Sequence, residues 1–224
     1  MRGLLIFDLD GVLVDVSNSY RETIIRTIQH FSGRCVTRDD IQQIKNRGGF
    51  NDDFHLCCTV IGEFGGGPSY QQVVDHFQRL FLGENDDGLI RQERWLPWHG
   101  FFERLAACWD FAIFTGRTRR EARLTLDRFA PQVVFDPVIG NQEVENQKPA
   151  PDGLLKIQAA WPGAAAVYLG DNIDDARSAR AAGVPFIGIA PQDGPRGAEL
   201  AALFRGECAR AVIETINELE QVLE

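Results

Sequence analysis

The chain has 224 residues, a formal net charge of −9 and 44% hydrophobic residues, the profile of one globular domain or of a domain carrying a smaller insertion. Its five cysteines include an adjacent pair and no C-x-x-C motif, which argues against a disulfide framework or a thiolate zinc site. No basic block suits a nucleic acid, and no stretch fits a signal peptide or a membrane span. We therefore expect a cytoplasmic protein that binds neither nucleic acid nor membrane, whereas its oligomeric state stays unknown.

The first predicted element is a short apolar strand, Leu4–Phe7. No strand pattern occurs from residue 16 to 95, where helix-start residues are followed by apolar side chains at helical spacing. The clearest of these helices begins after Ser69. We predict an all-helical unit, residues 16–95, inserted into an α/β domain that consists of residues 1–15 and 96–224. The predicted helix starts are Ser19, Thr37, Asn51 and Ser69.

In the second half of the chain, apolar runs alternate with helical patterns. Runs that are apolar throughout are typical of strands buried on both faces, as in a parallel sheet. Helix signals between them include the capping box Thr118-x-x-Glu121, Pro151 in a first turn, and Gly183 at a helix end. This alternation predicts a doubly wound, Rossmann-like α/β sheet. The further predicted strands are Phe111–Phe114, Val133–Phe135, Ala166–Leu169 and Phe186–Ile189.

Acidic residues follow two of these strands. Asp8 and Asp10 come directly after the first, and Asp171 follows the strand that begins at residue 166. Ligands of open α/β sheets bind beyond the carboxyl ends of the strands. Neighbouring carboxylates repel each other unless a cation neutralises them, and Mg²⁺ prefers such oxygen ligands. The first pair could then divide its work between a nucleophile and a proton shuttle. An ordinary β-turn at the first pair and helix capping within Gly170–Asp175 are the alternative interpretations.

Two further polar segments stand at expected strand ends or loops. Thr115-Gly116-Arg117 follows the second strand of the sheet, where a hydroxyl and backbone N–H groups can hold a phosphate. Lys148, one of three lysines in the chain, could hold a carboxylate and a phosphate together. The alternatives are a plain strand-to-helix turn and a solvated loop lysine.

In this order, the segments DLDGVLVD, FTGR, KPAPDGL and GDNIDDA resemble the four sequence motifs of the haloacid dehalogenase superfamily. Each motif is unspecific alone, but the ordered set is specific and covers essentially the whole chain. The segment GDNIDDARSARAAGVPFIGI also resembles the phosphoglycolate-phosphatase-like branch of that superfamily. In that branch a helical cap domain follows the first motif, which matches the predicted helical unit.

The resemblance implies a catalytic role for several residues. Asp8 would be the nucleophile that forms an aspartyl-phosphate. Asp10 would protonate the leaving alcohol and then activate water. Lys148 would also neutralise charge on Asp8. The implied phosphate-binding residues are Thr115, Gly116, Arg117 and Lys148.

The resemblance also implies a cofactor and a function. Mg²⁺ would be bound by Asp8, the backbone carbonyl of Asp10 and Asp171, with Asp175 or its neighbour Asp174 supporting the metal's water shell. The implied enzyme is a Mg²⁺-dependent phosphatase, a phosphoric monoester hydrolase acting on a small phosphorylated metabolite. The alternative is a sugar phosphomutase that uses the same aspartyl-phosphate. Asp10 argues against two other functions. Dehalogenase relatives lack an acid at this position, and a non-enzymatic binding module would not need one.

The helical unit contains a candidate substrate loop. Gly48-Gly49 stands between two predicted helices, and cationic side chains flank it. We expect a mobile loop that meets the part of the substrate beyond the phosphate; a solvated turn is the alternative. The candidate substrate residues are Lys45, Arg47 and Asn51.

Overall fold

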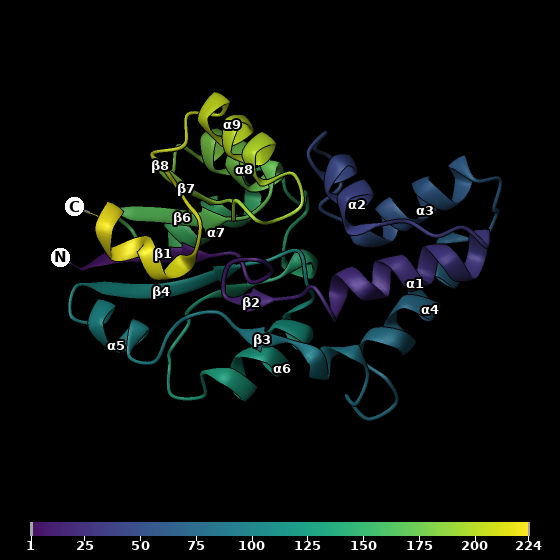
Figure 1. Cartoon of the computed structure of the whole chain (residues 1–224). Helices are drawn as coiled ribbons and strands as arrows, with labels where there is room; N and C mark the ends of the chain where they lie inside the picture. Colours follow the sequence, from purple (N-terminus) through teal and green to yellow (C-terminus); the bar gives the residue numbers. More distant parts are fainter. Residues whose placement is uncertain (1, 224) are drawn as a thin grey trace. The chain divides into compact units, whose positions relative to one another are not determined.

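The computed structural model describes residues 2–223, which divide into two compact units (Figure 1). The first consists of the residues up to Val14 together with those from Trp95 onward, and the second is Asp15–Arg94. Two short paired strands, β2 (Val14–Asp15) and β3 (Arg94–Trp95), mark the places where the chain leaves and re-enters the first unit. The boundaries lie one residue from those predicted, whereas the role of the second unit as a cap stays a prediction.

The first unit is built on a six-stranded parallel sheet in the order β5-β4-β1-β6-β7-β8. The chain begins at the central strand β1, adds β4 and β5 on one side, and then crosses over to add β6, β7 and β8 on the other. Strand order therefore reverses beside β1, which is where an open α/β sheet binds its ligands. The strands are β1 (Gly3–Phe7), β4 (Trp109–Phe114), β5 (Val138–Ile139), β6 (Ala166–Gly170), β7 (Phe186–Ile189) and β8 (Ala211–Ile213).

Alternate side chains of β1 contact helices on opposite faces of this sheet. Leu4 and Ile6 belong to a buried cluster with α7, α8 and α9, whereas Phe7 packs edge-on against Phe102 of α5 at a ring-centroid distance of 5.9 Å. Figure 1 shows α7, α8 and α9 on one side of the sheet and α5 and α6 on the other. The predicted doubly wound α/β class is confirmed. The helices are α5 (Phe101–Leu105), α6 (Arg119–Phe129), α7 (Asp152–Ala160), α8 (Ile173–Ala182) and α9 (Gly197–Gly206), with 3-10 turns η2 (Asn141–Glu143) and η3 (Ile216–Val222).

One predicted strand is wrong. Val133–Phe135 lies outside the sheet, and Val134 is 77% exposed. The hydrogen bonds to β4 begin further on, where the N–H of Asp136 donates to the carbonyl of Phe111 at 2.8 Å, and strand β5 is Val138–Ile139. The two apolar runs flank an Asp-Pro pair, and only the position of β4 decides which of them joins the sheet. The edge strand β8 was not predicted.

The second unit is helical. Its described elements are α1 (Tyr20–Ser32), α2 (Arg38–Lys45), α3 (Asp53–Glu63), α4 (Tyr70–Phe81) and the 3-10 turn η1 (Leu89–Gln92). An aromatic cluster joins three of the helices: the ring of Phe77 lies 5.0 Å from those of Tyr20 and Phe54, between centroids. Among residues 2–223, no helix is both long enough and apolar enough to cross a membrane.

Two of the predicted helix caps in this unit differ from the structure. Thr37 and Ser69 form the capping boxes that begin α2 and α4. Ser19 precedes α1, but its side chain makes no cap hydrogen bond. Asp52, not Asn51, caps α3. Its Oδ1 accepts hydrogen bonds from the N–H groups of Phe54 and His55, at 2.8 and 3.1 Å. Asn and Asp are equally good caps, so spacing alone did not distinguish these neighbours.

Candidate active site

The sheet brings the predicted motif residues to one edge of the first unit. Strands β4, β1 and β6 are adjacent and parallel, so their carboxyl ends point the same way. Asp8 directly follows β1, Thr115 follows β4 and Asp171 follows β6. Residues that are up to 163 positions apart in the chain (8 to 171) therefore meet at the point where strand order reverses.

Lys148 links the acid that follows β1 to an acid in the first turn of α8. Its Nζ lies 3.1 Å from Oδ1 of Asp8 and 2.8 Å from Oδ1 of Asp175. All three side chains are buried. Burial raises the pKa of Asp8 well above its ordinary value; Lys148 opposes this, whereas Asp175, Asp171 and Asp10 add to it. Burial lowers the pKa of Lys148, but the two carboxylates outweigh it and keep the group above its ordinary value, and therefore an ammonium.

The structure distinguishes Asp175 from Asp174. Oδ1 of Asp175 accepts a hydrogen bond from the hydroxyl of Tyr168 at 2.7 Å, and Oδ2 accepts one from the N–H of Asn172 at 3.0 Å. Asp174 is also fully buried, but its Oδ1 faces Arg177 at 4.0 Å. Asp175 is thus the acid that lies in the cluster, while the capping interpretation of this segment also holds for it.

Tyr168 is a site residue that the sequence analysis missed. It is fully buried in β6, and its position within an apolar run made it look like an ordinary core residue. Its hydroxyl contact with Asp175 is visible only when the strand and the start of α8 are placed together. The pKa of Tyr168 lies well above its ordinary value, because of burial and then of the nearby carboxylates, so the hydroxyl stays a proton donor.

Three carboxylates form a group that could hold a metal ion. Asp8, Asp171 and Asp175 each offer one oxygen, and these oxygens all lie within 4.8 Å of one another. Gly11, in a left-handed conformation at φ 70°, makes this approach possible, because a Cβ there would collide with Oδ2 of Asp171. Carboxylate oxygens crowded in this way suit a hard divalent cation. The donor set therefore fits the predicted cofactor class.

Thr115 and Arg117 tie the second motif to the first. Thr115 is buried, and its Oγ1 accepts a hydrogen bond from the N–H of Arg117 at 3.2 Å. The guanidinium of Arg117 is fully buried. Its Nε donates to Oδ1 of Asp10 at 2.8 Å, and its Nη1 donates to Oγ1 of Thr125 at 3.0 Å. The sequence analysis grouped this residue with the phosphate ligands; in the structure its guanidinium lies against the second acid of the first motif.

The candidate substrate residues of the second unit have different surroundings from one another. Lys45 is buried, and its Nζ lies 2.7 Å from Oδ1 of Asp53. Arg47 is exposed, and Asn51 is half-buried. The Nδ2 of Asn51 is buried without a hydrogen bond to any described residue. The Lys45 ammonium is thus already neutralised within its own unit.

These features define an acidic, lysine-bridged site at the switch point of a doubly wound sheet. Residues 3–183 match the family model of haloacid dehalogenase-like hydrolases. The chain belongs to this family, and the predicted resemblance is confirmed.

The chain is also similar to curated proteins and to solved structures. An imidazoleglycerol-phosphate dehydratase from Phytophthora nicotianae is 32% identical over 194 residues, which are 83% of this chain but 42% of that protein; the chain spans less than half of its length. A phosphoglycolate phosphatase from Cereibacter sphaeroides is 32% identical over 81% of this chain and 82% of its own. A haloacid dehalogenase-like hydrolase from Bacteroides fragilis shares the fold with a TM-score of 0.76, at 19% identity, over 98% of this chain and all of the other.

The predicted branch and enzyme class follow from these relatives. Phosphoglycolate phosphatases match most of the chain, which places it in the phosphoglycolate-phosphatase-like branch and makes it a phosphoric monoester hydrolase. A structure from Thermotoga maritima described as a β-phosphoglucomutase also shares the fold, with a TM-score of 0.67 at 20% identity over 99% of this chain and 98% of the other. That likeness concerns the fold alone.

Proposed function

We propose that this chain is a Mg²⁺-dependent phosphatase that hydrolyses a small phosphorylated metabolite through an aspartyl-phosphate on Asp8. The observation that carries the proposal is the buried ammonium of Lys148 between Asp8 and Asp175, with the third acid Asp171 beside them. A cation that neutralises the nucleophile beside a group of carboxylates able to hold a metal ion suits phosphoryl transfer. In that reaction, catalysis is mostly positioning and electrostatic stabilisation.

The first step would transfer the phosphoryl group to the protein. A carboxylate oxygen of Asp8 attacks phosphorus, and the bond from phosphorus to the substrate's ester oxygen breaks. Asp10 gives its proton to the leaving alkoxide, so the alcohol departs neutral. Thr115 would hydrogen-bond the phosphoryl oxygens, and Lys148 would balance their charge, with the N–H of Gly116 contributing a further donor.

The second step would return the protein to its starting state. Asp10, now a carboxylate, takes a proton from water as the water oxygen attacks phosphorus. The bond between phosphorus and Asp8 breaks, and inorganic phosphate leaves. Mg²⁺, held by Asp8, the backbone carbonyl of Asp10 and Asp171 with support from Asp175, would supply charge neutralisation for the phosphoryl oxygens.

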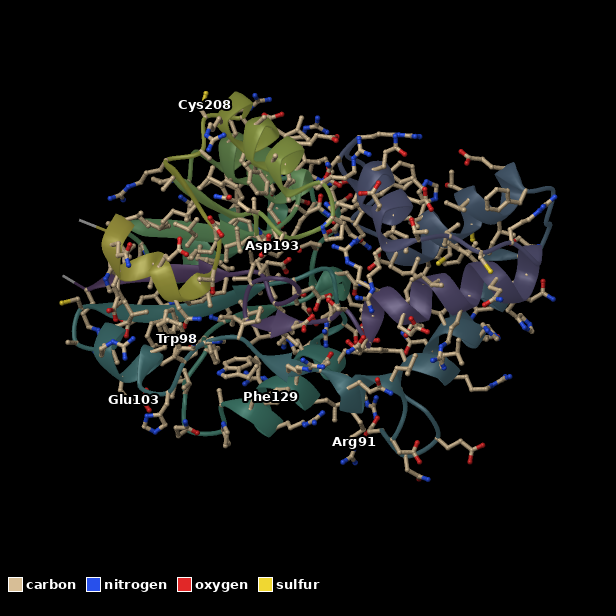
Figure 2. The ribbon with its side chains drawn as sticks, viewed as in Figure 1. Arg91, Trp98, Glu103, Phe129, Asp193 and Cys208 are labelled. Carbon is tan, nitrogen blue, oxygen red and sulfur yellow. The ribbon has the colours of Figure 1, made fainter. Side chains whose placement is uncertain are left out.

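The remaining parts of the proposal concern substrate and location. Arg47 and Asn51 are our candidates for contacts with the part of the substrate beyond the phosphate. Lys45 would support that loop through Asp53. All five cysteines are free thiols, and Cys208 projects beyond the end of α9 (Figure 2); free thiols are usual in the reducing cytoplasm.

A direct test is turnover by the purified chain with Mg²⁺ and a panel of phosphorylated metabolites, with release of inorganic phosphate as the readout. Acid quenching during turnover of a ³²P-labelled substrate should trap the label on Asp8. Phosphate release separates the phosphatase from the phosphomutase alternative, which would instead yield an isomer of the substrate. Absence of label from Asp8 in a turning-over enzyme would refute the proposed mechanism.

A further inference from the structure

Arg117 is among the largest fully buried side chains of the chain, although its charge is permanent. Its Nε donates to Oδ1 of Asp10 at 2.8 Å, and its Nη2 is ion-paired with the same oxygen. Its Nη1 donates at 3.0 Å to the hydroxyl of Thr125, which α6 holds in the buried interior. The guanidinium therefore fills the space between the helix and the acid.

The backbone of Arg117 is fixed as well. Its N–H donates to Oγ1 of Thr115 at 3.2 Å, and its carbonyl accepts from the N–H of Asn141 at 2.9 Å. Gly140 allows the second contact, because a Cβ there would lie 2.6 Å from the Arg117 carbonyl oxygen. Burying an arginine is costly unless it is well paired, so the residue is held in one place and holds Asp10 in turn.

We propose that Arg117 is the positioning residue for the acid–base group Asp10, an inference that rests on the proposed function. Both nitrogens that reach Asp10 meet Oδ1, which leaves Oδ2 as the atom that exchanges the proton with the leaving alcohol and with water. The Asp10 side chain is 25% exposed, so substrate and water can reach it, whereas Arg117 itself is 1% exposed. Arg117 acts through Asp10 and does not contact the phosphoryl group.

The position of Asp10 next to Arg117 also helps to distinguish a phosphatase from a phosphomutase. Arg117, Thr125 and Asp10 all belong to the first unit, so these contacts that hold the base lie within one unit. A mutase must protect its aspartyl-phosphate from water until a second hydroxyl arrives. A base that is held in place throughout promotes attack by water on the intermediate, which favours release of free phosphate.

The test is pre-steady-state turnover of p-nitrophenyl phosphate with Mg²⁺ by the wild type, Arg117→Lys and Arg117→Met. Nitrophenolate is a good leaving group and needs no proton, so phosphorylation of Asp8 should keep its rate. Attack of water on the intermediate needs the positioned base, so the steady-state rate should fall by roughly 10-fold for Lys and 10²-fold for Met, within the range of general acid–base contributions. The variants should then show a burst of one nitrophenolate per active site, and ³²P should accumulate on the protein.

A matched control is Arg119→Met. Arg119 is the first residue of α6; its side chain is 52% exposed and pairs with Glu143 at 3.3 Å. This variant should keep both phases of the wild type. Where Arg117→Met fails to fold, Thr125→Val removes the hydroxyl that anchors Nη1 without touching Asp10, and it should slow only the steady state.

Other outcomes would overturn the inference. Equal losses in the burst and in the steady state would make Arg117 a phosphate ligand or a purely structural residue. Unchanged kinetics in both Arg117 variants would show that Asp10 needs no such support. The proposed function fails separately: if the wild type forms no phosphoryl bond to Asp8, both ideas fall, whereas a labelled wild type with no burst in the variants refutes only the role of Arg117.

Discussion

Both units of this protein bury charged side chains, but they do so differently. In the first unit, Lys148 and several acids from separate segments of the chain meet at one sheet edge, and the acids outnumber the cations. In the second unit, the buried ammonium of Lys45 has a close carboxylate partner in Asp53, the first residue of the next helix, α3. The first arrangement gathers a surplus of carboxylates, and in the second one ammonium faces one carboxylate.

This difference indicates where the sequence serves chemistry and where it serves folding. A group of uncompensated acids lowers stability, and an active site tolerates it because catalysis needs it. A one-to-one buried pair performs no chemistry, although breaking it leaves a lone buried charge. Substitutions in the two units should therefore have opposite signatures: loss of turnover with a stable fold in the first, and loss of stability with retained core chemistry in the second.

The largest expected effect is that of Asp8→Asn. The amide is a poor nucleophile and removes a carboxylate from the metal group, so kcat should fall by roughly 10⁴-fold or more, as for other nucleophile deletions. The measurement is kcat for p-nitrophenyl phosphate with Mg²⁺. Asp174→Asn is the control, because Asp174 is buried near the site but faces Arg177, and it should lose far less than Asp175→Asn. Wild-type turnover by Asp8→Asn would end the covalent mechanism.

Metal removal should act on the first unit alone. After dialysis against EDTA, turnover should drop on the order of 10²-fold or more, because a bound cation supplies several kcal/mol of charge stabilisation. Mg²⁺ should restore it, and Ca²⁺ should restore much less because it favours more ligands at longer distances. Phosphate release after each addition is the readout. Full activity in chelated buffer would contradict a metal role for the group of Asp8, Asp171 and Asp175.

In the second unit, Lys45→Met should destabilise the helices by about 3–5 kcal/mol, because it removes the ammonium that pairs with the largely buried carboxylate of Asp53. Thermal unfolding followed by circular dichroism would show this as a lower or separate transition. The double variant Lys45→Met/Asp53→Leu should recover most of the loss. Hydrolysis of p-nitrophenyl phosphate below the transition should stay close to that of the wild type. Equal stability of the single variant and the wild type would show that the pair is not buried in solution.

A smaller effect concerns pH and the folded state of metal-free protein. The pKa of Asp8 is raised above 3.8, chiefly by burial, so the folded state binds this proton more tightly than the unfolded state. The resulting stabilisation is complete below pH 3.8, the ordinary pKa of the group, and is lost as the pH rises through the pKa of the folded state. At neutral pH in EDTA, Asp8→Asn should therefore unfold a few degrees above the wild type, since about 1 kcal/mol shifts Tm by roughly 2–4 °C in a chain of this size.

The control for that comparison is the same pair of proteins at lower pH and with Mg²⁺. The difference in Tm should shrink on acidification, as Asp8 takes up its proton in the wild type. Mg²⁺ should stabilise the wild type more than the variant. A difference that is constant from neutral to acidic pH would mean that Asp8 is not held at a raised pKa.

The smallest expected effect is that of Arg47→Ala. Arg47 is exposed in the second unit, so its loss should leave the fold and the hydrolysis of p-nitrophenyl phosphate unchanged. With the best metabolite of the panel, kcat/KM should fall by about 10-fold, because contacts with the non-reacting part of a substrate contribute to both kcat and KM. Equal losses on both substrates would assign Arg47 to structure or to the phosphate itself, and no loss on either would remove it from the site.

Much of the fold could be predicted from local pattern. The runs that begin at Leu4, Phe111, Ala166 and Phe186 are apolar without alternation, and this needs no tertiary information to indicate buried parallel strands. The misplaced run Val133–Phe135 shows the limit. It is as apolar as β5, and the choice between them depends on which backbone groups reach β4 across an Asp-Pro pair.

The sequence by itself determined the residue types and their order. Two acids follow the first strand, a threonine follows the next strand of the sheet, a lysine stands in a later loop, and an acidic segment follows β6. That order indicates phosphoryl-transfer chemistry, because each group stands at the carboxyl end of a strand or in a neighbouring loop. Only the tertiary structure decided which of these side chains contact one another. It placed Asp175 rather than Asp174 against Lys148, added the Tyr168 hydroxyl, and brought the Arg117 guanidinium against Asp10. Such choices depend on the rotation of a helix and the path of a long side chain, which neighbours distant in the sequence determine.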